Sequence, residues 1–142
     1  WLVGGEGTHL GQSIWLREIH GREEGAPPPV DLAAERAHGE LVREWISDGR
    51  VTAVHDVSDG GLLVALAEMA MGSGLGCTLD IPLTAASAFG EDQGRYIVTA
   101  RPGVTLEGAV RIGTVDGSTI AGIEVKALKA ANEAFFHDWM EA

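Results

Sequence analysis

Two carboxylates, a hydroxyl and two glycines follow a short β-branched segment and precede an apolar helical pattern over residues 62–71. These residues are Asp56, Ser58, Asp59, Gly60 and Gly61. Free N–H groups and the positive end of a helix dipole attract anions, and nearby carboxylates can recruit a metal ion to them. The spacing therefore suits phosphate chemistry. A structural alternative is that Ser58 or Asp59 caps the helix while the glycines allow tight packing.

A second polar cluster comes just before a predicted strand over residues 94–100. Its members are Glu91, Asp92 and Gln93, and Arg95 follows them. Loop residues at strand ends commonly reach a shared ligand crevice. There, Glu91 or Gln93 can hydrogen-bond ribose or amide groups, and Arg95 can attract phosphate. The alternative is an acidic surface turn in which Asp92 pairs with Arg95, and the residues alone leave both interpretations open.

Helices and strands alternate along the first two thirds of the chain, and an antiparallel pair is predicted to follow. Segments with a helical pattern are 12–19, 32–47, 62–71 and 126–140, and segments with a strand pattern are 1–3, 51–54, 75–81 and 94–100. Asp116 and Gly117 predict a β-hairpin between residues 110–115 and 119–125. This order favours an α/β sandwich with a mixed sheet. The last helix is expected to bury a face that holds Leu128, Ala131, Phe135, Phe136 and Trp139.

One connection is unusually short for such a fold. The predicted strands that end near Ala100 and begin near Val110 are joined by only a few residues. A parallel crossover connection needs a dozen or more. Either these strands pair antiparallel, or residues of the natural protein are missing from this sequence.

Composition excludes several classes of function. The net charge of −11 argues against non-specific nucleic-acid binding, and no apolar run approaches the ~18 residues that a membrane span needs. Cys77 is the one cysteine, so no internal disulfide can form, which fits a cytoplasmic location. The histidines show no metal-ligand spacing with Cys77, and the glycine-rich loop over residues 4–11 lacks the P-loop spacing. We therefore predict no catalytic and no metal-binding residue, and expect His55 to be a packed residue.

Three motifs, in their order along the chain, resemble the C-terminal domain of the aminoimidazole ribonucleotide synthetase superfamily. They are residues 55–69, 89–93 and 111–115. Within that superfamily, residues 11–18 and 25–32 resemble the last such domain of the phosphoribosylformylglycinamidine synthases. The resemblance covers essentially the whole chain. Because the chain also opens in a strand at Trp1, residues 1–142 are expected to form a single C-terminal domain of a longer multidomain enzyme.

The resemblance implies an ATP-dependent amidation in purine biosynthesis. Such a synthase converts formylglycinamide ribonucleotide, with ammonia derived from glutamine, to formylglycinamidine ribonucleotide, and releases ADP and phosphate. It implies ATP and magnesium as cofactors of the intact enzyme. The implied partners are the remaining domains of the same polypeptide, a glutaminase subunit and a small accessory subunit. Members of the superfamily usually have a helix between the strands that correspond to those at Ala100 and Val110.

The resemblance also bears on the candidate residues. In such synthases the catalytic histidine and main magnesium ligands belong to N-terminal domains, so this chain alone is expected to be inactive. An earlier copy of the domain uses the segment that matches residues 90–93 for substrate contacts, often with serine where Asp92 stands. Ligand-proximal candidates here are Asp56, Ser58, Asp59, Gly60, Gly61, Glu91, Asp92 and Gln93. The alternatives are a non-catalytic scaffold domain of that enzyme, and a domain of a sibling such as aminoimidazole ribonucleotide synthetase.

Overall fold

The computed structural model describes residues 1–141, except for the side chains of residues 136–138 and 141. The helices are α1 (Ile14–His20), α2 (Leu32–Ser47), α3 (Gly61–Ser73), α4 (Ala85–Phe89) and α5 (Val125–Glu141). The strands are β1 (Leu2–Val3), β2 (Ala53–Val57), β3 (Cys77–Leu79), β4 (Arg95–Thr99), β5 (Ala109–Val110), β6 (Gly113–Val115), β7 (Thr119–Ile120) and β8 (Ile123–Glu124). The helix predicted over residues 32–47 is confirmed at both ends. Asp31 caps its beginning and accepts hydrogen bonds from the backbone N–H groups of Ala33 and Ala34.

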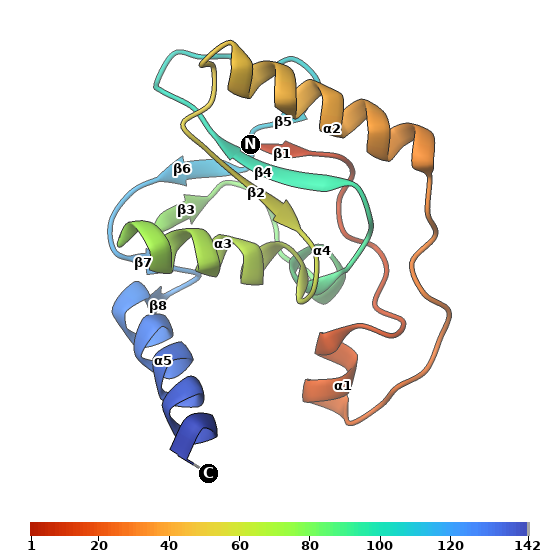
Figure 1. Ribbon diagram of the computed structural model, residues 1–142, viewed down its shortest axis with the longest axis vertical. Helices are drawn as coiled ribbons and strands as arrows, with labels where there is room; N and C mark the ends of the chain where they lie inside the picture. Colours follow the sequence, from red (N-terminus) through yellow and green to blue (C-terminus); the bar gives the residue numbers. More distant parts are fainter. Residues whose placement is uncertain (142) are drawn as a thin grey trace.

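The main sheet has the strand order β2-β4-β1-β5 (Figure 1). Leu2 lies opposite Ile97 on one side and Val110 on the other, and β1 runs antiparallel to both neighbours. The two remaining sheets, β3-β6 and β7-β8, are antiparallel pairs as well. The predicted α/β architecture is confirmed. Among the residues described, however, every strand pair is antiparallel, where the sequence favours a mixed sheet.

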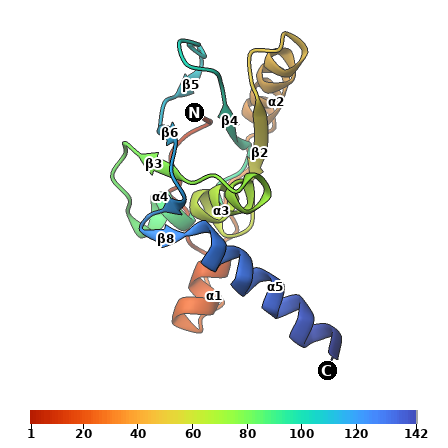
Figure 2. The same ribbon diagram turned by 90° about the vertical axis from the view of Figure 1, so that its left-hand side faces the viewer.

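The two faces of the main sheet are covered by different helices, as the turned view shows (Figure 2). Neighbouring residues of a strand point to opposite faces. Leu2 therefore packs in a core cluster with Leu62 of α3. Its neighbour Val3 packs with Val42 and Trp45 of α2. This alternation places α3 and the polar residues before it on one face, and α2 on the other.

The predicted hairpin at Asp116 and Gly117 is wrong. The segment before this turn pairs with β3, since Cys77 lies opposite Val115. Backbone hydrogen bonds at 3.0 and 3.1 Å also join Gly76 to Gly117 and Asp116. The residues that would form the first hairpin strand are thus already paired. The tight turn forms instead between β7 and β8 at residues 121–122, which have φ angles of 48° and 83°.

The short connection after β4 contains turns but no helix, and residues 100–108 form it. Strands β4 and β5 do not pair with each other, because β1 lies between them. Of the two alternatives that the short connection left open, antiparallel pairing of these strands is therefore wrong. Since both are antiparallel to β1, they run in the same direction, and the connection passes from one side of β1 to the other.

Helix α5 projects away from the rest of the domain (Figures 1 and 2). Its first turn is anchored by the buried Val125, but Phe135 and Trp139 are 62% and 73% exposed. The prediction that these two aromatic residues are buried is wrong. It is also wrong for Ala131, which is exposed, whereas Leu128 is partly buried. The side chain of Phe136 lies outside the described residues. Within the described part of the chain, no helix is long and apolar enough to cross a membrane.

Candidate functional site

The corner between β2 and α3 is built from glycines rather than from a capping side chain. Gly60 is the N-cap residue of α3 in a left-handed conformation, and no side chain of this segment caps the helix. The alternative in which Ser58 or Asp59 caps α3 is therefore wrong. Gly61 also has a positive φ of 72°, and a Cβ atom there would lie 2.6 Å from the carbonyl carbon of Phe89. The glycines thus allow the end of α4 to pack directly against the start of α3.

Glu91 provides the cap that the corner itself lacks. Its Oε1 atom accepts a hydrogen bond from the backbone N–H of Gly60 at 2.8 Å. The same oxygen accepts a second one from the backbone N–H of Ile14, also at 2.8 Å. One carboxylate oxygen therefore satisfies N–H groups at the beginnings of two helices, α3 and α1. Glu91 points into the domain, and its carboxylate is already engaged.

Asp92 is engaged in the same way with the glycine-rich loop near the N-terminus. Its Oδ2 atom accepts from the backbone N–H groups of Thr8 at 2.8 Å and His9 at 3.0 Å, and its Oδ1 atom accepts from the Thr8 hydroxyl at 2.8 Å. Burial alone would raise the pKa of Asp92. The hydrogen bonds from His9 and Thr8, with the nearby Arg95 charge, outweigh burial and lower the pKa. The hydrogen bonds from this loop thus keep the carboxyl group of Asp92 ionised.

Arg95 is buried beneath this loop, with 2% of its surface exposed. Its guanidinium group donates to the main-chain oxygens of Gly90 and Asp92, the latter at 3.0 Å. The predicted surface pairing of Asp92 with Arg95 is thus replaced by bonds from Arg95 to the main chain. Burial lowers the pKa of Arg95, although the Asp92 charge opposes this shift. These bonds to the main chain give Arg95 a structural role, while its buried Nη1 atom has no hydrogen-bond partner among the described atoms.

The remaining polar candidates lie at a recess of about 470 Å³ between the ends of β2 and β4 and the start of α2. We call this the polar recess. Its polar lining residues are Glu35, Arg36, Asp56, Ser58, Gln93, Arg95 and Tyr96. Side chains of this kind can donate to or accept from hydroxyl and amide groups of a ligand. The structure therefore brings Asp56, Ser58 and Gln93 together, while Asp59 is exposed and does not line the recess.

Glu35 and Arg36 were not among the residues singled out from the sequence. They lie in the first turns of α2, about twenty residues before β2. The Asp31 cap indicates where α2 begins. No local pattern indicates that this end of the helix lies beside Asp56 and Gln93, because that proximity depends on how α2 packs across the sheet.

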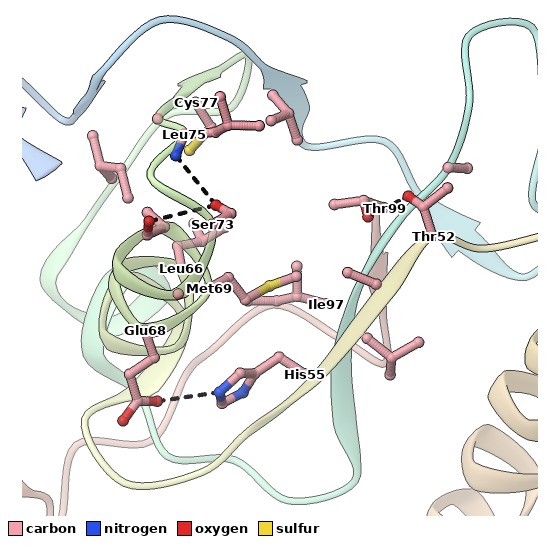
Figure 3. A pocket seen from close by; sticks show the side chains of 18 residues that line it. Thr52, His55, Leu66, Glu68, Met69, Ser73, Leu75, Cys77, Ile97 and Thr99 are labelled. Carbon is pink, nitrogen blue, oxygen red and sulfur yellow. Dashed lines mark hydrogen bonds and ion pairs between the residues drawn. The ribbon is translucent and has the colours of Figure 1, made fainter.

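A larger cavity of about 570 Å³ lies between α3 and the β2 and β4 strands (Figure 3). We call this the apolar cavity, since side chains such as Leu66, Met69 and Ile97 line it. His55 lies at its edge, with its Nε2 atom 3.4 Å from an oxygen of Glu68. His55 is thus a partly buried residue with a carboxylate partner. Within the described residues, no three His, Cys, Asp or Glu side chains are arranged to hold a metal ion.

The family of the chain follows from comparison with known proteins. Residues 1–126 match the family described as AIR synthase related protein, C-terminal domain. The chain belongs to this family, which confirms the resemblance seen in its motifs. The architecture agrees with solved structures of T. maritima PurL. The TM-score is 0.68 for its complex with FGAR and 0.62 for its complex with ATP. Each is 20% identical and matches 90% of this chain, but the match covers only 27% and 25% of those chains.

Curated relatives identify the kind of enzyme in which such a domain occurs. The phosphoribosylformylglycinamidine synthase subunit PurL of Novosphingobium aromaticivorans is 71% identical over 141 residues, which are 99% of this chain and 20% of that protein. The subunit of the same name from Chelativorans sp. is 49% identical, over 95% of this chain and 21% of that protein. The chain therefore spans about a fifth of the length of these relatives.

The relatives differ in length over the region that they share with this chain. The alignment with the Chelativorans protein extends over 159 positions, which exceeds the 142 residues of this chain. That relative therefore contains residues with no counterpart here. The alignment with the Novosphingobium protein extends over only 141 positions. The shorter length is shared with this relative, so it is not peculiar to the present chain.

Proposed function

We propose that this chain is the C-terminal domain of a phosphoribosylformylglycinamidine synthase of purine biosynthesis. The observation that carries the proposal is the 71% identity, over 99% of the chain, to a synthase subunit PurL. The intact enzyme would convert formylglycinamide ribonucleotide and glutamine-derived ammonia to formylglycinamidine ribonucleotide, with ATP as the energy source. The ammonia would come from a glutaminase subunit, and a small accessory subunit would complete the assembly. We place this enzyme in the cytoplasm.

The surface of the chain supports a role within a larger protein. Its accessible surface is 8660 Å² for a mass of 14.9 kDa. Compact monomers of this mass expose about 7000 Å². The difference is about twice the ~800 Å² that each partner of a standard protein–protein interface buries. We infer that part of this surface packs against the remaining domains of the same polypeptide.

Within that enzyme, this domain would supply one wall of a ligand cleft, formed by the polar recess. Asp56, Ser58 and Gln93 would hydrogen-bond hydroxyl or amide groups of substrate or nucleotide. The recess holds the carboxylates of Glu35 and Asp56 together with Arg36 and Arg95. These formal charges balance, so the recess suits such neutral groups better than a triphosphate. The described residues do not fit a magnesium site, since they offer no cluster of ligands. Magnesium would then be held by other domains.

A non-catalytic scaffold role is the second candidate. The observation in its favour is that the carboxylates of Glu91 and Asp92 accept hydrogen bonds from backbone N–H groups of the same chain. In that case the domain would support its neighbours and contact no ligand.

Steady-state kinetics of the intact enzyme can separate the two roles. With the recess as a ligand wall, Asp56→Asn and Gln93→Ala should each raise the KM for formylglycinamide ribonucleotide or for ATP by about three- to tenfold, the effect of one lost hydrogen bond. The matched control is Glu107→Gln, an exposed carboxylate outside the recess. Unchanged KM values in both recess variants would favour the scaffold. ATP turnover by the 142-residue chain alone would contradict the assignment of catalysis to other domains.

A further inference from the structure

We infer that Glu91 is a positioning residue, which acts as the resident anion of the corner where α1 and α3 begin. Its carboxylate occupies the place that an external anion such as phosphate would take at the start of α3. The glycine corner after β2 is therefore already filled, and external phosphate does not bind there. This inference concerns the chain itself and does not depend on the synthase assignment.

The geometry of the carboxylate supports this role. Its Oε1 atom lies 2.8 Å from the backbone nitrogens of both Gly60 and Ile14, although these residues are 31 and 77 positions away in sequence. Neither α1 nor α3 has an acidic residue in its first turn. Glu91 thus supplies the negative charge that the N-terminal end of a helix favours. It does so for two helices with a single oxygen atom.

The segment that carries Glu91 is fixed on both sides. The backbone N–H of Glu91 donates to the carbonyl of His9 at 3.2 Å. The buried Arg95 binds the carbonyl oxygens of the residues before and after Glu91. Gly61 lets the Phe89–Gly90 backbone approach closely, because a side chain at this position would collide with it. The main chain that carries Glu91 is thus held rigidly, so little conformational entropy is lost when its carboxylate is positioned at the corner.

An external phosphate would have to displace this carboxylate and leave it without its two N–H partners. A partly buried carboxylate that loses its hydrogen-bond donors is unfavourable. The chain also has a net charge of −11, which repels anions. Both effects keep Glu91 in place, and its loss should separate α1 from α3 at their N-terminal ends.

Acid titration of the ¹⁵N-labelled chain, followed by NMR, tests the inference. In the wild type, the amide resonances of Gly60 and Ile14 should shift together with one midpoint as a single carboxylate is protonated. The shared transition should persist in Asp59→Asn and Asp92→Asn, and it should disappear in Glu91→Gln. Independent midpoints for the two amides, or a shared transition that survives in Glu91→Gln, would overturn the inference.

Chemical rescue provides a second readout. Glu91→Ala should have a lower Tm than the wild type. Sodium formate should raise that Tm more than sodium chloride of equal ionic strength, because formate can enter the vacated place. Neither formate nor inorganic phosphate should have such an excess effect on the wild type. A specific phosphate effect on the wild type, or no formate effect on a folded Glu91→Ala variant, would contradict the inference. If this variant does not fold, the titration of Glu91→Gln decides.

Discussion

Asp92 binds Thr8 through both its carboxylate oxygens, although the two residues are 84 positions apart in the sequence. One oxygen accepts the backbone N–H of Thr8 and the other its hydroxyl, each at 2.8 Å. The contact fixes the loop after β1 to the segment before β4. Because β1 and β4 are neighbours in the sheet, this contact closes one end of the strand pair.

Replacement of Asp92 should change how stability depends on pH. The folded state lowers the pKa of Asp92 from its ordinary value of 3.8. Its contribution to stability is therefore present above that value and is lost as the pH falls through the lower, folded value. At pH 7, Asp92→Asn should reduce the free energy of unfolding by about 1–2 kcal/mol, since charge-assisted hydrogen bonds become neutral ones. Urea unfolding should show this difference shrinking at pH 2–3, and a difference that does not depend on pH would contradict the proposed ionisation.

Two glycines of the same loop offer a matched comparison. A Cβ atom at Gly7 would lie 2.5 Å from the carbonyl oxygen of Ala86 and 3.2 Å from Arg95 Nη1. A Cβ atom at Gly5 would meet nothing within 4 Å. We expect Gly7→Ala to destabilise the chain by about 1–3 kcal/mol through overpacking, whereas Gly5→Ala should be within about 0.5 kcal/mol of the wild type. Thermal unfolding of the two variants measures the difference, and equal Tm values would show that the loop is not packed as described.

Cys77 should be a slow nucleophile. Burial raises the pKa of its thiol, and the charge of Asp116 raises it further. Less thiolate is therefore present at pH 8 than in a free cysteine. Alkylation by iodoacetamide should be slower than for glutathione, and its rate should still rise above pH 9. Asp116→Asn removes one cause of the shift, so it should speed the reaction at pH 8; an unchanged rate would rule out a role for that charge.

The apolar cavity should bind a neutral, apolar fluorescent probe such as Nile red. Met69 lines the cavity, whereas Met71 on the same helix does not. Both side chains are partly buried, so they form a matched pair. Met69→Lys should lower probe fluorescence several-fold, because a charge in this cavity is poorly solvated. Met71→Lys should keep most of the probe fluorescence. An equal loss of fluorescence in both variants would show that the probe binds outside the apolar cavity.

Local signals predicted the elements that local chemistry determines. The helical pattern over residues 32–47 predicted α2 with its observed bounds, and the strand pattern over residues 94–100 predicted β4. The turn at Asp116 failed because the preceding strand pairs with β3 instead, a choice made by distant residues. Helix α5 has an amphipathic pattern, but a pattern indicates only which face is apolar. It does not indicate whether other parts of the domain pack against that face, and in the structure Phe135 and Trp139 are exposed.

In the candidate site too, some features follow from the local sequence and others depend on distant residues. The sequence identified Asp56, Ser58 and Gln93 as polar residues near strand ends, and the structure places them around one recess. It also identified Glu91 and Asp92, whose side chains turn inward to Ile14 and Thr8. Residue type alone does not distinguish a carboxylate that is free to bind a ligand from one that is already hydrogen-bonded within the chain. Those partners lie 77 and 84 positions away, beyond the reach of any local pattern.

The central position of β1 has a consequence for the order in which the chain folds during synthesis. Leu2 must pair with Ile97 and Val110, which a ribosome adds about 5–20 s later at ordinary elongation rates. Until then β1, which is one of the two inner strands of the main sheet, has no neighbours. Helices α2 and α3 can form early, but the sheet that they cover cannot be completed. Folding should therefore be a late event in synthesis, slowed by the long sequence separation of its strand pairs.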